Sequence, residues 1–184
     1  MKLCEAKQAL RKEIASLKKL YKEATLQELS SKIMSRLEES ILFQKASCIA
    51  FYHALPGEVQ TAHFIEKWYK HKRILLPVVK GNNLQLFLYA GQKSLKIGAF
   101  GIWEPSEDSL TVPEEEIDLV IVPGVAFDKQ HNRLGRGKGF YDRLLSTLSA
   151  PKIGICYSFQ LKEHIPTESF DKKMDLIITE KETL

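Results

Sequence analysis

The spacing of apolar positions changes along the chain, and this change predicts the order of the elements. In the first 21 residues the apolar positions lie three to seven apart, which predicts a helix with one buried stripe over residues 3–21. A capping box that starts at Thr25 and includes Glu28 predicts a second helix over residues 25–39. Two further helices are expected, over residues 61–70 and from the glycine-rich segment to about residue 148.

Short apolar runs rich in β-branched residues separate the helices and predict strands. The predicted strands cover residues 46–52, 73–79, 84–89, 118–122, 153–156 and 176–179. The segment 90–113 carries three glycines and two prolines, and its polar character predicts one long loop. Long loops in compact domains often serve function.

The alternation of strands and helices predicts a mostly parallel sheet with helices on both faces. At 184 residues the chain is expected to form one domain, residues 1–184. Ligands of such sheets bind outside the carboxyl ends of the strands. The segment 53–61 and the glycine-rich segment both follow strands, so we expect them to face one crevice.

Charge and cysteine content narrow the class of protein. The net charge is only +4, and positive charge gathers in two places, the first 23 residues and the region 128–143. Local charge suits a compact anionic ligand better than a long nucleic-acid track. The three cysteines form no C-x-x-C pair, which indicates a reducing cytoplasm. We expect no signal peptide and no membrane span.

The segment 133–139, here called the glycine loop, carries the clearest chemistry. Three glycines alternate with Arg136 and Lys138, so backbone N–H groups and full positive charges lie together. The spacing is neither the dinucleotide fingerprint nor a Walker loop, and a simple turn is the alternative. With the charges around it, the loop favours phosphate binding. Asp142 follows at a helix start, where it either holds a metal ion or stabilises the helix N-terminus.

Lys7 and Arg11 lie four residues apart on the first predicted helix, at one edge of its apolar stripe. A long cationic side chain there can bury its stem and extend its charge beyond the core. Plain solvation of both side chains is the alternative.

These motifs resemble those of the 5-formyltetrahydrofolate cyclo-ligase family, along nearly the whole chain. The most specific part is the stretch 118–143, with Pro-Gly at 123–124 and the Asn-Arg-Leu-Gly-Arg-Gly-Lys-Gly core at 132–139. Residues 7–11, 57–61, 101–105 and 171–175 support it. The family often has Tyr-Tyr-Asp where this chain has Phe140, Tyr141 and Asp142, so a hydroxyl group is missing at the first position.

The resemblance implies a cytoplasmic, monomeric enzyme with a three-layer α/β/α sandwich, a Rossmann-like variant. It would use ATP and Mg²⁺ to convert 5-formyltetrahydrofolate into 5,10-methenyltetrahydrofolate, and it would bind neither nucleic acid nor membrane. The implied catalytic residues are Arg136 and Lys138. The implied ATP-binding residues are Lys7, Arg11, Arg133, Leu134, Gly135, Arg136, Gly137, Lys138, Gly139, Phe140 and Tyr141. The implied substrate-binding residues are His53, Glu58, Arg136, Gly137, Lys138, Gly139 and Phe140. The implied metal ligands are Asp142 and Asp175.

Two other functions fit parts of the pattern. A sugar-phosphate or acyl-group enzyme can be built on a similar α/β scaffold, because a fold alone does not determine function. A small basic nucleic-acid binder is the non-enzymatic alternative, but repeated exposed aromatic residues do not accompany the charge.

Overall fold

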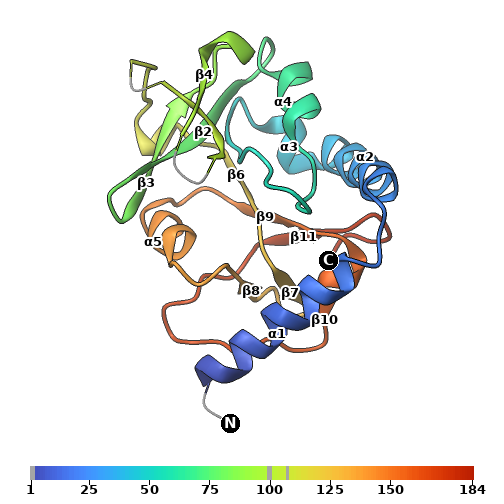
Figure 1. Ribbon diagram of the computed structural model, residues 1–184. Coiled ribbons are helices and arrows are strands. Elements are labelled where there is room, and N and C mark those ends of the chain that lie inside the picture. The colour runs from blue at the N-terminus through green and yellow to red at the C-terminus, as the bar shows by residue number, and fades with distance from the viewer. Residues whose placement is uncertain (1–2, 99–100, 107) are drawn as a thin grey trace.

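Six strands form the central sheet of the computed structural model, which describes residues 3–98, 101–106 and 108–184 (Figure 1). Their order is β11-β9-β6-β1-β2-β3, and every neighbouring pair is parallel except β2 with β3. The strands are β1 (Cys48–Ala50), β2 (Arg73–Lys80), β3 (Asn83–Leu88), β6 (Leu119–Val122), β9 (Lys152–Ile155) and β11 (Leu176–Ile178).

Helices cover both faces of this sheet because side chains alternate along each strand. In β1, Ile49 joins the core that faces α2 to α4, whereas Cys48 and Ala50 join the core that faces α5. Figure 1 shows α2, α3 and α4 on one side and α5 on the other. These helices are α2 (Glu23–Glu39), α3 (Ile41–Lys45), α4 (Ala62–Trp68) and α5 (Phe140–Thr147).

A second, three-stranded sheet carries the glycine loop. It consists of β7 (Ala126–Asp128), β8 (Arg133–Leu134) and β10 (Leu161–Lys162), in the order β10-β7-β8. Helix α1 (Leu3–Lys18) packs on it through Ile14, which meets a small core with Ala126 and Leu134. Figure 1 shows α1 running alongside this sheet. The packing therefore brings α1 next to the glycine loop.

The buried carboxylate of Asp128 shapes the turn between β7 and β8. Its Oδ1 accepts hydrogen bonds from the backbone N–H groups of Gln130 and Asn132, both at 2.9 Å. Its Oδ2 accepts from Asn132 Nδ2 and from the backbone N–H of Ile165, also at 2.9 Å. Four donors satisfy this buried charge and hold the approach to the glycine loop in one conformation.

The structure confirms some of the predicted elements and corrects others. The largely parallel sheet with helices on both faces is confirmed. The capping box is wrong: α2 starts at Glu23, and its N-cap is Lys22, which makes no side-chain capping bond. Helix α3 was not predicted. Nor were the short strands of the second sheet, in which β7 pairs with its neighbour β8 and with the distant β10.

The segment 90–113 is not simply a loop. It contains the 3₁₀ turn η1 (Gln92–Ser94) and the antiparallel pair β4 (Leu95–Ile97) and β5 (Trp103–Pro105). Residues 99, 100 and 107 of this segment lie outside the described residues. Two further 3₁₀ turns are η3 (Glu114–Glu116) and η4 (Ser158–Gln160). The closer likeness to a Rossmann fold and the single domain stay predictions.

Among the described residues, none of the helices combines the length and the apolar character that crossing a membrane requires.

Candidate active site

A cavity of about 380 Å³ lies at the carboxyl ends of β1 and β6, which are neighbours in the middle of the central sheet. From β1 the chain continues to β2 on one side, and from β6 to β9 on the other, so a crevice opens between the two strand ends. The volume falls in the usual range of small-molecule sites, ~300–1,000 Å³. Residues from the predicted site that line the cavity are His53, Glu58, Arg133, Gly135, Arg136, Gly137, Lys138, Gly139, Phe140, Tyr141 and Asp142.

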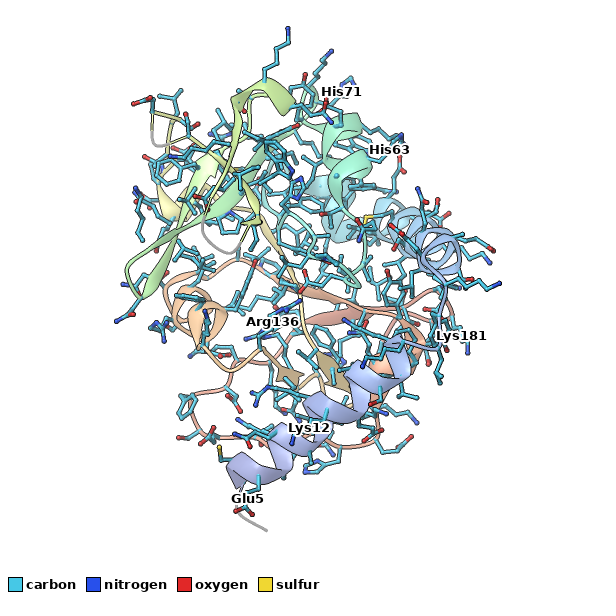
Figure 2. All side chains as sticks on the ribbon, in the orientation of Figure 1. Glu5, Lys12, His63, His71, Arg136 and Lys181 are labelled. Atoms are coloured by element: carbon cyan, nitrogen blue, oxygen red, sulfur yellow. The ribbon has the colours of Figure 1, made fainter. Side chains whose placement is uncertain are left out.

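This lining confirms that the segment after β1 and the glycine loop face one crevice. The two segments also bond directly. Arg136 donates to Glu58 Oε1 from Nε at 3.1 Å and from Nη2 at 2.7 Å. The arginine side chain is 55% exposed and the glutamate side chain 10%. In Figure 2 the Arg136 label lies near the centre of the molecule, between α5 and α1.

Glu58 is held from several sides. Its Oε2 accepts the backbone N–H of Leu55 at 3.0 Å, and its backbone carbonyl accepts the hydroxyl of Tyr157 at 3.0 Å. The hydroxyl oxygen of Tyr157 also lies 2.8 Å from Ser30 Oγ on α2. The turn that presents Glu58 is therefore anchored to the core, and its carboxylate has little freedom to move.

The glycines of the loop are required by backbone geometry and by a close neighbour. Gly137 has φ +100° and Gly139 has φ +68°, conformations that L-residues with a side chain rarely adopt. A Cβ at Gly137 would lie 3.4 Å from the Arg11 guanidinium. Arg11 Nε donates to the carbonyl of Gly135 at 2.9 Å. Helix α1 thus places a cation directly against the glycine loop.

Arg133 and Asp142 form an ion pair beneath the loop. Arg133 Nη2 donates to Asp142 Oδ1 at 2.8 Å, with side-chain exposures of 3% and 21%. Arg133 Nη1 donates to the carbonyl of Pro123 at 3.2 Å, and its guanidinium lies 5.6 Å from the centre of the Tyr141 ring. Arg133 Nε is buried and lacks a hydrogen-bond partner among the described residues. Arg133 therefore supports the cavity from below, and one oxygen of Asp142 is already occupied.

Lys7 forms ion pairs with another part of the chain. Its ammonium donates to Glu168 Oε2 and Asp171 Oδ2, both at 2.7 Å. Burial lowers the pKa of Lys7, but the hydrogen bonds and charges of these two acids outweigh burial and raise it overall. Lys7 is not among the residues that line the cavity.

Two predicted site residues lie elsewhere. Asp175 precedes β11 and accepts the backbone N–H of Lys152 at 2.7 Å, at the amino end of the sheet and away from the cavity. The structure therefore does not bring Asp142 and Asp175 together as one metal site. Leu134 turns its side chain into the small core beneath α1, so only its backbone is near the loop.

Burial keeps the titratable groups beside Glu58 uncharged. It lowers the pKa of His53, partly offset by a hydrogen bond with the backbone of Ala54, so the imidazole is neutral at pH 7. Burial raises the pKa of Tyr52 and Tyr141, and the negative charge of Glu58 adds to both shifts. These groups can donate or accept hydrogen bonds without carrying charge.

Sequence reasoning missed the apolar wall of the cavity. Val79 and Leu84 line it because the β2–β3 hairpin is antiparallel and its turn reaches over the carboxyl ends of the sheet. Ile102 lines it too, whereas the neighbouring Trp103 is 47% exposed and not part of the lining. His63 and His71 lie far from Arg136 in Figure 2.

A parallel α/β sheet with an apolar cavity and a glycine- and arginine-rich loop at its carboxyl edge defines an enzyme-type site for a small ligand with anionic groups. Comparison with known proteins narrows this class. The model of the 5-formyltetrahydrofolate cyclo-ligase family matches residues 4–180. The chain belongs to this family of enzymes, which sets aside the sugar-phosphate, acyl-group and nucleic-acid alternatives.

Individual relatives agree. The 5-formyltetrahydrofolate cyclo-ligase of Haemophilus influenzae is 36% identical over 170 residues, covering 88% of this chain and 89% of that protein. The enzyme of the same name from Escherichia coli K12 is 33% identical, covering 83% and 88%. The NMR structure of 5,10-methenyltetrahydrofolate synthetase from Aquifex aeolicus matches with a TM-score of 0.88 at 38% identity, covering 96% of this chain and 91% of that one. A structure from Mycoplasma pneumoniae of the same description matches with a TM-score of 0.77 at 29% identity, covering 95% and 98%.

Proposed function

We propose that this protein converts 5-formyltetrahydrofolate into 5,10-methenyltetrahydrofolate at the expense of ATP, with ADP and phosphate released. The observation that carries this proposal is the shared cavity. The glycine loop, with its positive charges, and a fixed carboxylate, Glu58, face the same space, and they are close enough for Arg136 of the loop to bond Glu58. A nucleotide and a nitrogen-rich ring can therefore meet there.

The triphosphate binds along the glycine loop. Backbone N–H groups of Gly135, Gly137 and Gly139 can approach phosphate oxygens without side-chain interference. Arg136 and Lys138 neutralise these oxygens, and Arg11 supports them from α1. Leu134 can contribute only through its backbone. Arg133 supports the loop through its bonds to Asp142 and Pro123 and does not bind the phosphates directly. Lys7 can reach a phosphate only by giving up Glu168 and Asp171.

The folate ring occupies the apolar part of the cavity. Glu58 accepts hydrogen bonds from ring N–H groups, which orients the ring as well as binding it. His53 is neutral and can donate to or accept from the same ring. Phe140 and Tyr141, at the start of α5, offer aromatic faces for stacking.

The chemistry needs a better leaving group than oxide. The formyl oxygen attacks the γ-phosphorus of ATP. The bond between that phosphorus and the oxygen that bridges the β- and γ-phosphates breaks, and ADP leaves. N10 then attacks the formyl carbon and loses its proton, and the carbon–oxygen bond breaks to release phosphate. Holding N10 against the activated carbon can contribute ~7–11 kcal/mol. Each donor placed on developing charge can add ~3–4 kcal/mol.

Mg²⁺ would be held by Asp142 together with phosphate oxygens. The arrangement fits, because Mg²⁺ in nucleotide sites typically uses one or two carboxylates. Oδ1 of Asp142 bonds Arg133, and Oδ2 makes no hydrogen bond within the described residues. A bound Mg²⁺ would neutralise part of the phosphate charge. Asp175 lies at the amino end of β11, opposite the sheet edge that carries the cavity, so we do not assign it to this ion.

A direct assay tests the proposal. Purified protein is mixed with 5-formyltetrahydrofolate and Mg-ATP, and the near-ultraviolet absorbance of the methenyl product is followed. We expect product only when ATP is present, with one ADP formed per product. Product without ATP would remove the mechanism, and absence of product at every ATP concentration would remove the assignment.

Variants of the loop locate the chemistry. Arg136→Ala and Lys138→Ala should each lower turnover at least about tenfold, since each removes a charge from the phosphate site. Lys12→Ala is the matched control, because this exposed lysine lies on the same helix as Arg11 and outside the cavity. Full turnover in folded R136A and K138A proteins would show that the loop is wrongly assigned.

A further inference from the structure

Three cations of α1 lie on one side of the helix and face three different segments. Lys7, Arg11 and Lys18 are spaced by four and seven residues, which puts them within ~40° of one another around the axis. Lys7 pairs with residues 168 and 171, and Arg11 contacts the glycine loop. The third, Lys18, adjoins the turn that carries Glu58 and has no role in the proposed chemistry.

The surroundings of Lys18 are unusual for a lysine. A Cβ at Gly57 would lie 3.5 Å from Lys18 Cδ and 3.9 Å from Nζ, so the side chain lies directly on this glycine. The ammonium makes no hydrogen bond or ion pair with the residues that the structure describes, although the side chain is half-buried. Burial lowers the pKa of Lys18, the charge of Glu58 partly offsets this, and Arg136 adds to the lowering. A half-buried ammonium without a hydrogen-bond partner is unfavourable, so a second state of the protein in which it gains a closer counter-charge would stabilise it.

Such a state arises when Arg136 binds the nucleotide and Glu58 binds the folate, as proposed above. In this structure both Nε and Nη2 of Arg136 are used on Glu58. When Arg136 turns to the triphosphate, the buried carboxylate of Glu58 keeps, within the described part of the chain, only the backbone N–H of Leu55. A buried charge that loses its partner is strongly destabilised, and it would compete with the nucleotide for the arginine. Recapture of Arg136 would occupy the carboxylate oxygen that the folate ring needs.

The titratable groups that face Glu58 come from several elements. The tyrosines among them have raised pKa values because of burial and stay neutral, so they cannot replace a cation. His53, in the same cavity, is also neutral at pH 7. The groups around Glu58 are Lys18 of α1, Arg136 of the glycine loop, Tyr52 after β1, Tyr141 of α5 and Tyr157 after β9.

We propose that Lys18 is a positioning residue that takes over the charge of Glu58 when Arg136 moves to the nucleotide. The inference rests on the proposed function, because it needs a nucleotide that attracts Arg136 and a folate that uses Glu58. It makes one specific prediction: Lys18 strengthens folate binding only while nucleotide is bound.

The test uses the full-length protein and compares binding with and without nucleotide. Lys18→Met keeps a stem of similar length on Gly57 and removes the charge. The dissociation constant of 5-formyltetrahydrofolate is measured by calorimetry, alone and with a non-hydrolysable ATP analogue. We expect K18M to weaken folate binding at least about fivefold with the analogue and less than about twofold without it, since only one partly buried charge pair changes. Equal weakening in both states, or none in either, overturns the proposal.

Further variants complete the design. Lys18→Arg restores a cation and should recover most of the lost affinity, and Lys19→Met, at the exposed neighbouring position, should bind folate like the original protein. In a Glu58→Gln background K18M should add less than about twofold, because Lys18 acts through Glu58. A full additional loss in that background would mean that Lys18 contacts the substrate itself, and would overturn the proposal. If K18M does not fold, Lys18→Gln takes its place.

The two proposals fail in different ways. If the original protein does not bind the analogue or does not form the methenyl product, the proposed function fails. If it does both, and K18M binds folate normally in the presence of the analogue, only the role of Lys18 is wrong.

Discussion

Burial distinguishes the arginines around the glycine loop, although the sequence presents them as one cluster. Arg133 is buried and bonds Asp142 and Pro123, so it supports the loop. Arg136 is half exposed and can leave Glu58 for a ligand. Arg143 donates to the carbonyl of Asn82 and thereby ties α5 to the β2–β3 turn. Only Arg136 of these three combines a position in the cavity with the freedom to change partners.

Asp142→Asn tests the double role of Asp142. Loss of the carboxylate leaves the buried Arg133 without its counter-charge, so the free energy of unfolding should fall by about 2–4 kcal/mol. The same change removes a negatively charged oxygen from the metal, so more Mg²⁺ should be needed for half-maximal turnover. Urea unfolding and a magnesium titration measure the two effects. Glu115→Gln, an exposed acid, is the control, and an Asp142→Asn protein with unaltered stability and metal requirement would contradict both roles.

Much of the site could be predicted residue by residue, because local motifs carry it. The glycine loop, His53 and Glu58 lie in the cavity where the sequence placed them. Lys7 and Asp175 do not, since their partners come from distant segments that no local pattern reveals. The ion pair of Arg133 with Asp142 was equally hidden, although the two residues are close in sequence.

At the scale of elements, one aromatic ring joins the two sheets. Phe127 of β7 packs against Gly124, after β6, and Gly154, inside β9. A Cβ at Gly124 would lie 2.5 Å from the ring, and one at Gly154 would overlap it. Gly154 is thus a glycine in a strand because another side chain occupies its space. The small sheet, and with it the glycine loop, is positioned by this contact.

Gly154→Ala should therefore lower the free energy of unfolding by about 1–3 kcal/mol through overpacking. Combining it with Phe127→Leu, which shortens the opposing side chain, should cost less than the sum of the two single changes. Chemical denaturation of the three variants and the original protein measures this coupling. Strict additivity would show that the ring and the glycine do not compete for the same space.

The elements that were predicted correctly share a strong local pattern. Helix α1 and the strands of the central sheet have clear apolar periods, and they occur where expected, within a few residues. The strands of the small sheet are two or three residues long, and β10 pairs with β7 across more than thirty residues. Such pairs depend on tertiary contacts, so a periodic pattern could not reveal them.

At the scale of the whole molecule, the parallel order of the central sheet explains where the site lies. The ends of β1 and β6 meet at one edge, so segments more than sixty residues apart in sequence face each other. Helix α1 contacts two parts of this edge, the glycine loop through Arg11 and the turn at Gly57 through Lys18. The first helix therefore packs against two of the segments that line the cavity.

The central claim is that the formyl oxygen receives the γ-phosphoryl group, and the fate of that oxygen tests it most directly. The substrate is labelled with a heavy oxygen isotope in its formyl group and converted by the protein in the presence of ATP and Mg²⁺. The released phosphate is then analysed by mass spectrometry. The account predicts that each phosphate carries the label. Methenyl product accompanied by unlabelled phosphate would contradict it.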